Sequence, residues 1–470
     1  MTESLQLYPG TVDLARFRPT FFPHPGCVIE GVALRRRGSP ASAPPFFTVQ
    51  RMTVQASYVD LFVRPGYIAQ IILEDLRVHI PPIGTLAGES EQSNRLNTRV
   101  GRIVANGSVL EIARKEKEPL RFEFHTLTVD SFRGDGPLTY RASFHNPLPP
   151  GDIVSKGQFG PWNFNEPRET PVSGSYTLER ANLGVFHGIA GILSSKGEFS
   201  GALGHITSLG TIEVRDFSVT RSKHSVRVHS RYHAVVNGMN GDVALKRVEA
   251  SFLQTVVTAN GDIASKPGTK GKSTSLDLAV REGRIQDVLR LFVKEPQPPL
   301  SGPANIRAHV TLPPRIQPFL QQVRLTGDFD VASGRFSKPD TQVKVDQLSE
   351  RASTEKKKDN AEPPTVESSL SGHASVQNGE ATLTNLTFTI PDARADMHGT
   401  YNLMDEKVDL HGTLKTDAEF TKVTGGGSKS IFLKPFDAIF KRHPRGAVIP
   451  VQLTGKYSDP HPGLEIVPKK

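Results

Sequence analysis

Apolar and polar residues alternate along much of this chain. In residues 325–331, Leu, Gly, Phe and Val hold the odd positions, while Thr and Asp hold the even ones. Similar runs cover residues 386–390, 408–414 and 449–457. A period of two places the apolar residues of a strand on one face, and one apolar face with one polar face is typical of antiparallel sheets. The pattern predicts an all-β protein built on a long curved antiparallel sheet with a few short helices.

A short glycine element recurs inside these runs or at their ends. It consists of any residue, a glycine, usually a polar residue, and then an aromatic or aliphatic one, as in residues 156–159, 260–263, 398–401 and 454–457. Glycine within a strand marks a bend, a bulge or a close backbone approach. We interpret the element as a device that curves the sheet, the alternative being ordinary strand-end glycines. Its spacing is irregular, so it defines no strict solenoid repeat.

Helical periodicity is rare. Residues 283–294 and 430–443 each carry an apolar stripe at helical spacing. Shorter helices are predicted near residues 182–193 and 342–351. The polar segment 353–364 contains three consecutive lysines and two prolines, and its composition predicts a disordered loop.

The composition argues against several classes of protein. Hydrophobic residues make up 37% of the chain, and no run approaches the ~18 apolar residues that a membrane-spanning helix needs. Residues 1–6 show neither the basic nor the apolar region of a secretory signal, so none is expected. The single cysteine, Cys27, excludes an intrachain disulfide and any multi-cysteine metal site.

The formal net charge of +9 raises the question of nucleic-acid binding. Lys and Arg are scattered along the chain, however, and one Trp and eight Tyr leave few side chains for base stacking. The one dense cluster, residues 35–37, suits a solvated strand end or attraction to anionic lipid headgroups. No nucleic-acid partner is expected.

No motif for catalysis, metal binding or cofactor binding is found. Residues 266–273 are similar to a phosphate-binding loop, but Lys266 replaces its first glycine. His229 and His233 share a strand face with two arginines, whose charge opposes a cation. We therefore expect a non-enzymatic protein with no catalytic, metal-binding or cofactor-binding residues.

A series of motifs fills the C-terminal third of the chain, at residues 323–334, 346–352, 370–376, 384–391, 397–403, 408–414, 433–440 and 448–457. Their order resembles the C-terminal domain of AsmA-like proteins. Residues 52–80 and 283–292 resemble the N-terminal part and the small central helix of the same family. The resemblance implies N-terminal and central β repeats in residues 1–300. It also implies a C-terminal domain in residues 301–470, with the disordered loop near 353–364.

The resemblance also implies that the protein binds lipid. AsmA-like proteins are kin of bridge-like lipid-transfer proteins, whose sheets form an apolar groove for acyl chains, and they are linked to outer-membrane biogenesis. The expected partners are phospholipid acyl chains and the inner or outer membrane surface. The expected location is the periplasm, in association with the inner membrane, although the family's usual N-terminal anchor is not seen in the sequence. The residues expected to line the groove are Leu325, Phe329, Val331, Leu386, Phe388, Ile390, Val408, Leu410, Leu414, Ile449, Val451 and Leu453.

Two other interpretations stay open from the residues alone. Alternation alone favours a β-sandwich that acts as a structural or interaction module of the cell envelope, with the same side chains packed in its core. A hydrolase of envelope polymers would need paired carboxylates in a cleft, and it ranks last. Only the family resemblance favours a groove over the sandwich. Such a groove would have to be long, because a lipid with ~30 methylenes costs roughly 24 kcal/mol to expose, at ~0.8 kcal/mol for each methylene.

Overall fold

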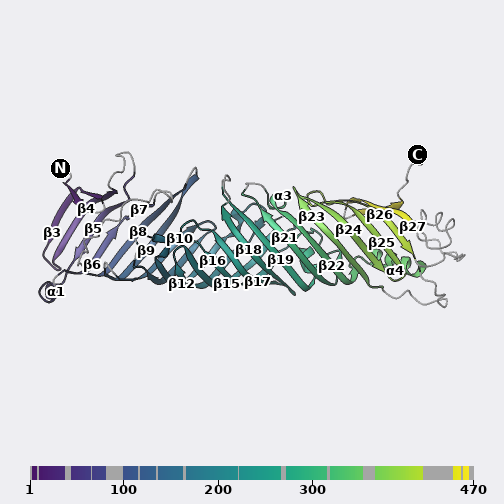
Figure 1. Ribbon diagram of the computed structural model, residues 1–470, viewed down its shortest axis with the longest axis horizontal. Coiled ribbons are helices and arrows are strands. Elements are labelled where there is room, and N and C mark those ends of the chain that lie inside the picture. Colours follow the sequence, from purple (N-terminus) through teal and green to yellow (C-terminus); the bar gives the residue numbers. More distant parts are fainter. Residues whose placement is uncertain are drawn as a thin grey trace. The chain divides into compact units, whose positions relative to one another are not determined.

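Strands account for most of the computed structural model of the chain (Figure 1). The structure describes residues 3–7, 10–36, 44–64, 66–80, 99–114, 117–133, 136–161, 163, 166–220, 222–265, 271–314, 318–352, 366–416, 448–456 and 459–464. The strands form one long sheet, and the helices are short. The prediction of an all-β fold is confirmed.

The chain divides into two compact units. Unit 1 comprises Met1–Val185, Ile192–Val214 and Arg231–Lys246, and unit 2 comprises Phe186–Gly191, Arg215–Ser230 and Arg247–Lys470. Strands β15 (His205–Val219), β16 (Val226–Val236) and β17 (Val243–Phe252) contribute residues to both units. The division at residue 300 that the family resemblance implies stays a prediction.

The strands that lie wholly within unit 1 pair mostly antiparallel with their neighbours. They are β1 (Glu3–Leu7), β2 (Gly10–Leu14), β3 (Arg16–Thr20), β4 (Gly26–Arg36), β5 (Phe47–Gln55), β6 (Tyr67–Glu74), β7 (Arg77–Ile80), β8 (Arg99–Arg114), β9 (Lys117–Arg133), β10 (Leu138–Pro147), β11 (Pro150–Phe159), β12 (Pro171–Asn182) and β14 (Ile192–Ala202). Unit 1 also holds α1 (Tyr58–Val63) and the 3-10 turns η1 (Pro167–Glu169) and η2 (Leu183–Val185). Strand β8 runs parallel to both β6 and β7, so the sheet is mixed rather than purely antiparallel as predicted.

Unit 2 continues the antiparallel pairing. Its strands are β13 (Ile189–Ala190), β18 (Thr255–Ser265), β19 (Lys272–Arg284), β20 (Leu300–Ser301), β21 (Pro303–Leu312), β22 (Arg324–Phe336), β23 (Ser368–Gln377), β24 (Glu380–Ile390), β25 (Ala393–Asn402), β26 (Lys407–Thr416), β27 (Val448–Lys456) and β28 (Asp459–Leu464). Its helices are α2 (Ile285–Arg290), α3 (Phe319–Gln322) and α4 (Pro339–Ala352).

Bulges keep apolar residues on one face although single residues are inserted into the strands. In β22 the register shifts between Val331 and Gly334, and in β24 it shifts between Leu383 and Leu386. Ser333 and Asn385 at these shifts have φ of 49° and 50°. The left-handed residue absorbs the insertion, so the side chains on either side of it stay on the same face.

The helix predictions have mixed outcomes. A helix within 283–294 is confirmed by α2, and one over 342–351 by α4, which begins at Pro339. Of the short helix expected near 182–193, only the 3-10 turn η2 forms, and the strands β13 and β14 replace the rest, where Gly188 and Gly191 adopt positive φ. The predicted helix 430–443 and the predicted disordered loop 353–364 lie outside the described residues.

Ile449 offers a direct test of the packing in unit 2. Its side chain is completely buried, while the neighbouring Val448 is exposed. We expect Ile449→Ala to lower the free energy of unfolding by about 2–5 kcal/mol, because truncation leaves a cavity. Val448→Ala, the matched control, should change it by less than about 0.5 kcal/mol. Chemical denaturation followed by circular dichroism measures both, and equal effects would contradict the packing described.

Candidate functional site: an apolar face of the sheet

The strand register of unit 2 brings the twelve predicted residues to one face of the sheet. Residues directly opposite each other in an antiparallel pair share a face. We call this surface the apolar face. It is defined by four rows of residues, of which the second is aligned through a bulge and the other three are paired from strand to strand.

The rows can be followed from strand to strand. The first contains Ala304, Val331, Leu370, Phe388, Ala395, Leu414 and Ile449, and the second contains Ile306, Phe329, Gly372, Leu386, Met397, Gly412 and Val451, with Gly372 beside Leu386 at the bulge. The third contains Ala308, Gly327, Ala374, Leu383, Gly399, Leu410 and Leu453, and the fourth contains Val310, Leu325, Val376, Ala381, Tyr401, Val408 and Gly455. Ile390 lies beyond the first row, opposite Ala393. None of these positions carries a charged side chain.

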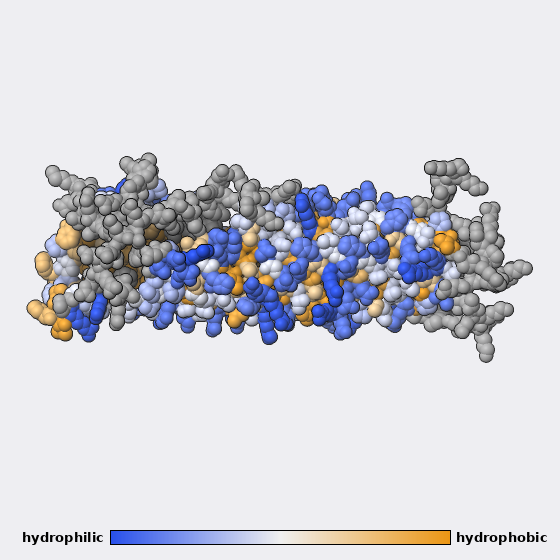
Figure 2. Space-filling view, viewed as in Figure 1, coloured by the Kyte–Doolittle hydropathy of each residue, from blue (hydrophilic) through white to orange (hydrophobic). Residues whose placement is uncertain are grey.

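The opposite face of the same strands is polar. Asp277 and His309 face each other across β19 and β21 with Oδ1 and Nδ1 2.8 Å apart. Asp328 and His373 do the same across β22 and β23 at 2.7 Å. Figure 2 shows mainly hydrophilic side chains over β22 to β25 on the face in view. The apolar and polar residues of the alternating runs are thus sorted to opposite sides, as the period of two predicts.

The first row is covered by other parts of the protein. Val331 packs in one buried cluster with Ile285 of α2, Leu300 of β20 and Ala304. Ile390, Leu414 and Ile449 form a second cluster with Ala393 and Ala395, against which Val345 and Leu348 of α4 pack. Four of the twelve predicted residues therefore fill protein cores. A lipid could reach them only if α2 or α4 moved.

The other rows are less enclosed. Leu386 and Leu410 are buried, whereas Leu325, Phe329, Val408, Val451 and Leu453 are half-buried, as is Phe388 in the first row. Of these, Phe388 and Val451 pack against the cluster around Ile449, whereas Leu325, Phe329, Val408 and Leu453 lie outside both buried clusters. The role of these residues as a lipid lining stays a prediction.

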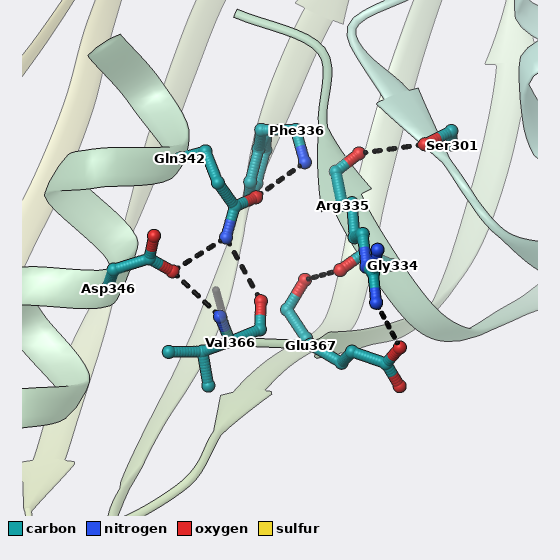
Figure 3. A network of polar contacts seen from close by, with 9 residues as sticks. Ser301, Gly334, Arg335, Phe336, Gln342, Asp346, Val366 and Glu367 are labelled. Carbon is teal, nitrogen blue, oxygen red and sulfur yellow. Dashed lines mark hydrogen bonds and ion pairs between the residues drawn. The ribbon is translucent and has the colours of Figure 1, made fainter. Parts of the chain in front are cut away.

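A buried polar network fixes α4 at the edge of the apolar face (Figure 3). Asp346 accepts hydrogen bonds from Gln342 Nε2 and from the Val366 backbone N–H, both at 2.8 Å. Gln342 Oε1 in turn accepts from the Phe336 N–H at 2.8 Å. Ser349 Oγ donates to the Pro391 carbonyl at 3.1 Å. These bonds join the helix to the strands on either side of residues 353–365.

Unit 1 carries a cluster of hydroxyl groups that the sequence pattern did not reveal. Tyr176 O–H is hydrogen bonded to Tyr232 and lies 3.0 Å from Ser195 Oγ, while Ser208 Oγ lies 3.2 Å from Tyr232. Burial, more than these bonds, raises the pKa of Tyr176 above the ordinary value of a tyrosine, so its hydroxyl stays protonated. The paired Gly197 and Gly210 leave room for Tyr232 above them.

A shallow hollow of about 430 Å³ lies on the polar face of unit 2. Its lining includes the Asp277–His309 and Asp328–His373 pairs and Arg307. It is broadly open to solvent, and no group of three or more His, Cys, Asp or Glu placed to hold a metal occurs among the described residues. The hollow is consequently a weaker candidate than the apolar face.

No protein-family model matches the chain, and neither curated proteins nor solved structures provide a significant match. The resemblance to AsmA-like proteins thus stays a prediction from the sequence motifs. Within the part of the chain that the structure describes, no helix has the length and apolarity needed to cross a membrane.

Proposed function

We propose that this chain is a non-enzymatic lipid-binding protein whose apolar face holds the acyl chains of phospholipids. The observation that carries the proposal is the sorting of side chains in unit 2. Four adjacent rows lack charge, yet the helices and the short strand β20 cover mainly the first row. Half-buried apolar side chains over several neighbouring strands can be covered by a flexible acyl chain.

The pairing of the strands supports an incompletely covered sheet. The described strands join into one sheet through their pairings. A β-sandwich, the alternative considered from the sequence, packs the inner faces of two sheets together. The single sheet therefore favours the lipid-binding proposal over the sandwich.

The cellular setting follows only from the resemblance. As an AsmA-like protein, the chain would work in the periplasm beside the inner membrane. There it would transfer phospholipid between membranes or assist outer-membrane assembly. Its partners would be lipid and the membrane surfaces rather than nucleic acid.

The test begins with lipid that accompanies the purified chain. A solvent extract of purified protein, analysed by mass spectrometry, should contain phospholipid, and the protein should bind a fluorescent phospholipid saturably. A carboxylate placed among acyl chains costs about 2.5 kcal/mol or more. We therefore expect Phe329→Asp combined with Leu383→Asp to lower lipid affinity by more than about 1,000-fold, since the two costs add to about 5 kcal/mol.

The matched control places the same charges at neighbouring positions of these strands, on the polar face of the sheet. Thr326 and Thr382 are exposed and lie on the same two strands. Thr326→Asp combined with Thr382→Asp should leave lipid binding unchanged, and circular dichroism checks that both double variants fold. Repeated absence of lipid from the wild type, or equal binding by the two folded variants, would refute the proposal.

A further inference from the structure

One edge of unit 1 exposes large apolar side chains, whose exposed fractions run from 49% for Tyr58 to 89% for Phe22. Two segments form it: the turn between β3 and β4, with Phe21 and Phe22, and helix α1 with the residues that flank it. Phe22 is 89% exposed and Phe62 of α1 is 87% exposed. The other exposed members are Phe17, Phe21, Tyr58, Val59, Leu61 and Val63. Figure 2 shows hydrophobic side chains gathered where Figure 1 labels α1. We call this surface the apolar tip.

The two segments are held together as one surface. Tyr58 O–H donates to the Phe21 carbonyl, and the Ala56 N–H donates to the Pro25 carbonyl at 2.8 Å. Strands β4 and β5 pair to their ends beside the tip, with Gly26 opposite Gln55. The exposure of these side chains is therefore set by the fold and not by an independent loop.

The exposed apolar side chains of helix α1 do not stabilise the fold by packing in a core. Helix α1 has six residues and none of them is buried. A short helix in a soluble protein is normally stabilised by packing its apolar side on a core. Here Leu61, Phe62 and Val63 face solvent instead. A contiguous apolar patch of this kind marks a surface that another molecule covers.

The charges beside the tip identify the covering molecule. Arg18 precedes the β3–β4 turn, Arg64 follows α1, and the backbone N–H of Arg99 donates to the Gly66 carbonyl at 3.1 Å. Asp60, the carboxylate of α1, lies 3.8 Å from Arg64 Nε and offsets part of this positive charge, but the Arg64 side chain is still 65% exposed. Three arginines against this one carboxylate leave the tip with a net positive charge. Aromatic side chains that enter the headgroup region, flanked by arginines, are the signature of an interfacial contact with anionic lipid. A second copy of the chain would bring the same arginines against each other in an isologous interface.

We propose that the apolar tip inserts into the surface of a bilayer that contains anionic phospholipid. Phe22 and Phe62 enter the boundary between headgroups and acyl chains, and Arg18, Arg64 and Arg99 contact the phosphates. This inference deepens the proposed contact with membranes. It rests on residues of unit 1, however, and its test does not depend on acyl chains binding to unit 2.

The experiment uses the full chain and vesicles in flotation assays. One set of vesicles contains phosphatidylcholine alone, and the other contains phosphatidylcholine mixed with phosphatidylglycerol. We expect binding to the anionic vesicles that weakens as salt is raised. Phe22→Ser combined with Phe62→Ser should lower the affinity roughly 10- to 100-fold, since each aromatic side chain loses its burial in lipid.

Two further variants complete the design. Leu148→Ser combined with Leu253→Ser removes two exposed leucines away from the tip and should bind vesicles as the wild type does. Arg18→Gln combined with Arg64→Gln should remove the preference for anionic vesicles. Circular dichroism confirms that each variant is folded.

The outcomes separate the possible occupants. Failure of the wild type to bind anionic vesicles, or unchanged binding by the Phe22 and Phe62 double variant, overturns the proposal. Self-association that this double variant abolishes, without vesicle binding by the wild type, assigns the tip to a second copy and also overturns it. Failure of the acyl-binding proposal alone would show as a chain that binds vesicles but carries no extractable lipid.

Discussion

Replacing Gly399 by valine should destabilise unit 2 by about 2–6 kcal/mol, the sum of the cost of a strained backbone and the cost of overpacking. Gly399 lies in the third row of the apolar face with φ of 148°, a conformation that side chains with a Cβ rarely adopt. A Cβ at this position would lie 2.0 Å from the Asp409 carbonyl oxygen and 2.9 Å from Leu410 Cα. Because both contacts are backbone atoms of the paired strand, β25 and β26 would have to separate.

Gly463 in β28 is the matched control for this substitution. Its φ is not in the left-handed region, and the nearest atom to an added Cβ would be Gln452 Nε2 at 3.3 Å, the end of a flexible side chain. Gly463→Val should therefore cost less than about 1 kcal/mol. The midpoint of chemical denaturation compares the two variants. Equal midpoints would show that the close approach of β25 and β26 at Gly399 does not constrain the sheet.

This glycine shows how far the sequence determines the fold. The recurring glycine element predicted close backbone approach, and at Gly157, Gly261 and Gly399 an added Cβ would indeed meet the backbone of the paired strand at 2.0 Å. The bulges fall elsewhere. At Glu282 and Ser333 a residue other than glycine adopts the left-handed conformation. Nothing in the residue type at those positions signals a bulge, so only the register of the folded strands locates them.

For the candidate site, the sequence predicted which residues share a face but not which of them other elements cover. Alternation correctly placed residues such as Leu325 and Phe329 on one side, because a period of two follows from strand geometry alone. The covering of Val331 and Ile449 depends on where α2 and α4 dock, which is a long-range property. The apolar tip was missed since Phe22 and Phe62 lie in short segments without a period. Exposed aromatic side chains cannot be distinguished from buried ones by residue type.

The docking of α4 leads to the other large expected effect, that of Asp346→Ala. Asp346 is buried and accepts from both Gln342 and the Val366 N–H, so its removal leaves the backbone donor of the half-buried Val366 without an acceptor. A buried donor left unsatisfied costs about 1–3 kcal/mol, and bonds to a charged acceptor are at the upper end. We expect a loss of about 2–4 kcal/mol in stability, which falls mainly on the contact between α4 and the sheet.

Local release of α4 should follow from this loss. Val345 and Leu348 would leave the cluster around Ile449, and the amides of α4 should exchange with deuterium faster while those of β25 and β26 change little. Asp346→Asn keeps one carbonyl oxygen as an acceptor and should show a smaller change. Asp340→Ala removes an exposed carboxylate from the first turn of the same helix and should cost less than about 1 kcal/mol. If the amides of α4 stay protected from exchange in Asp346→Ala, apolar packing alone holds the helix over the first row. Acyl chains could then reach Ile449 and Leu414 only by displacing Val345 and Leu348.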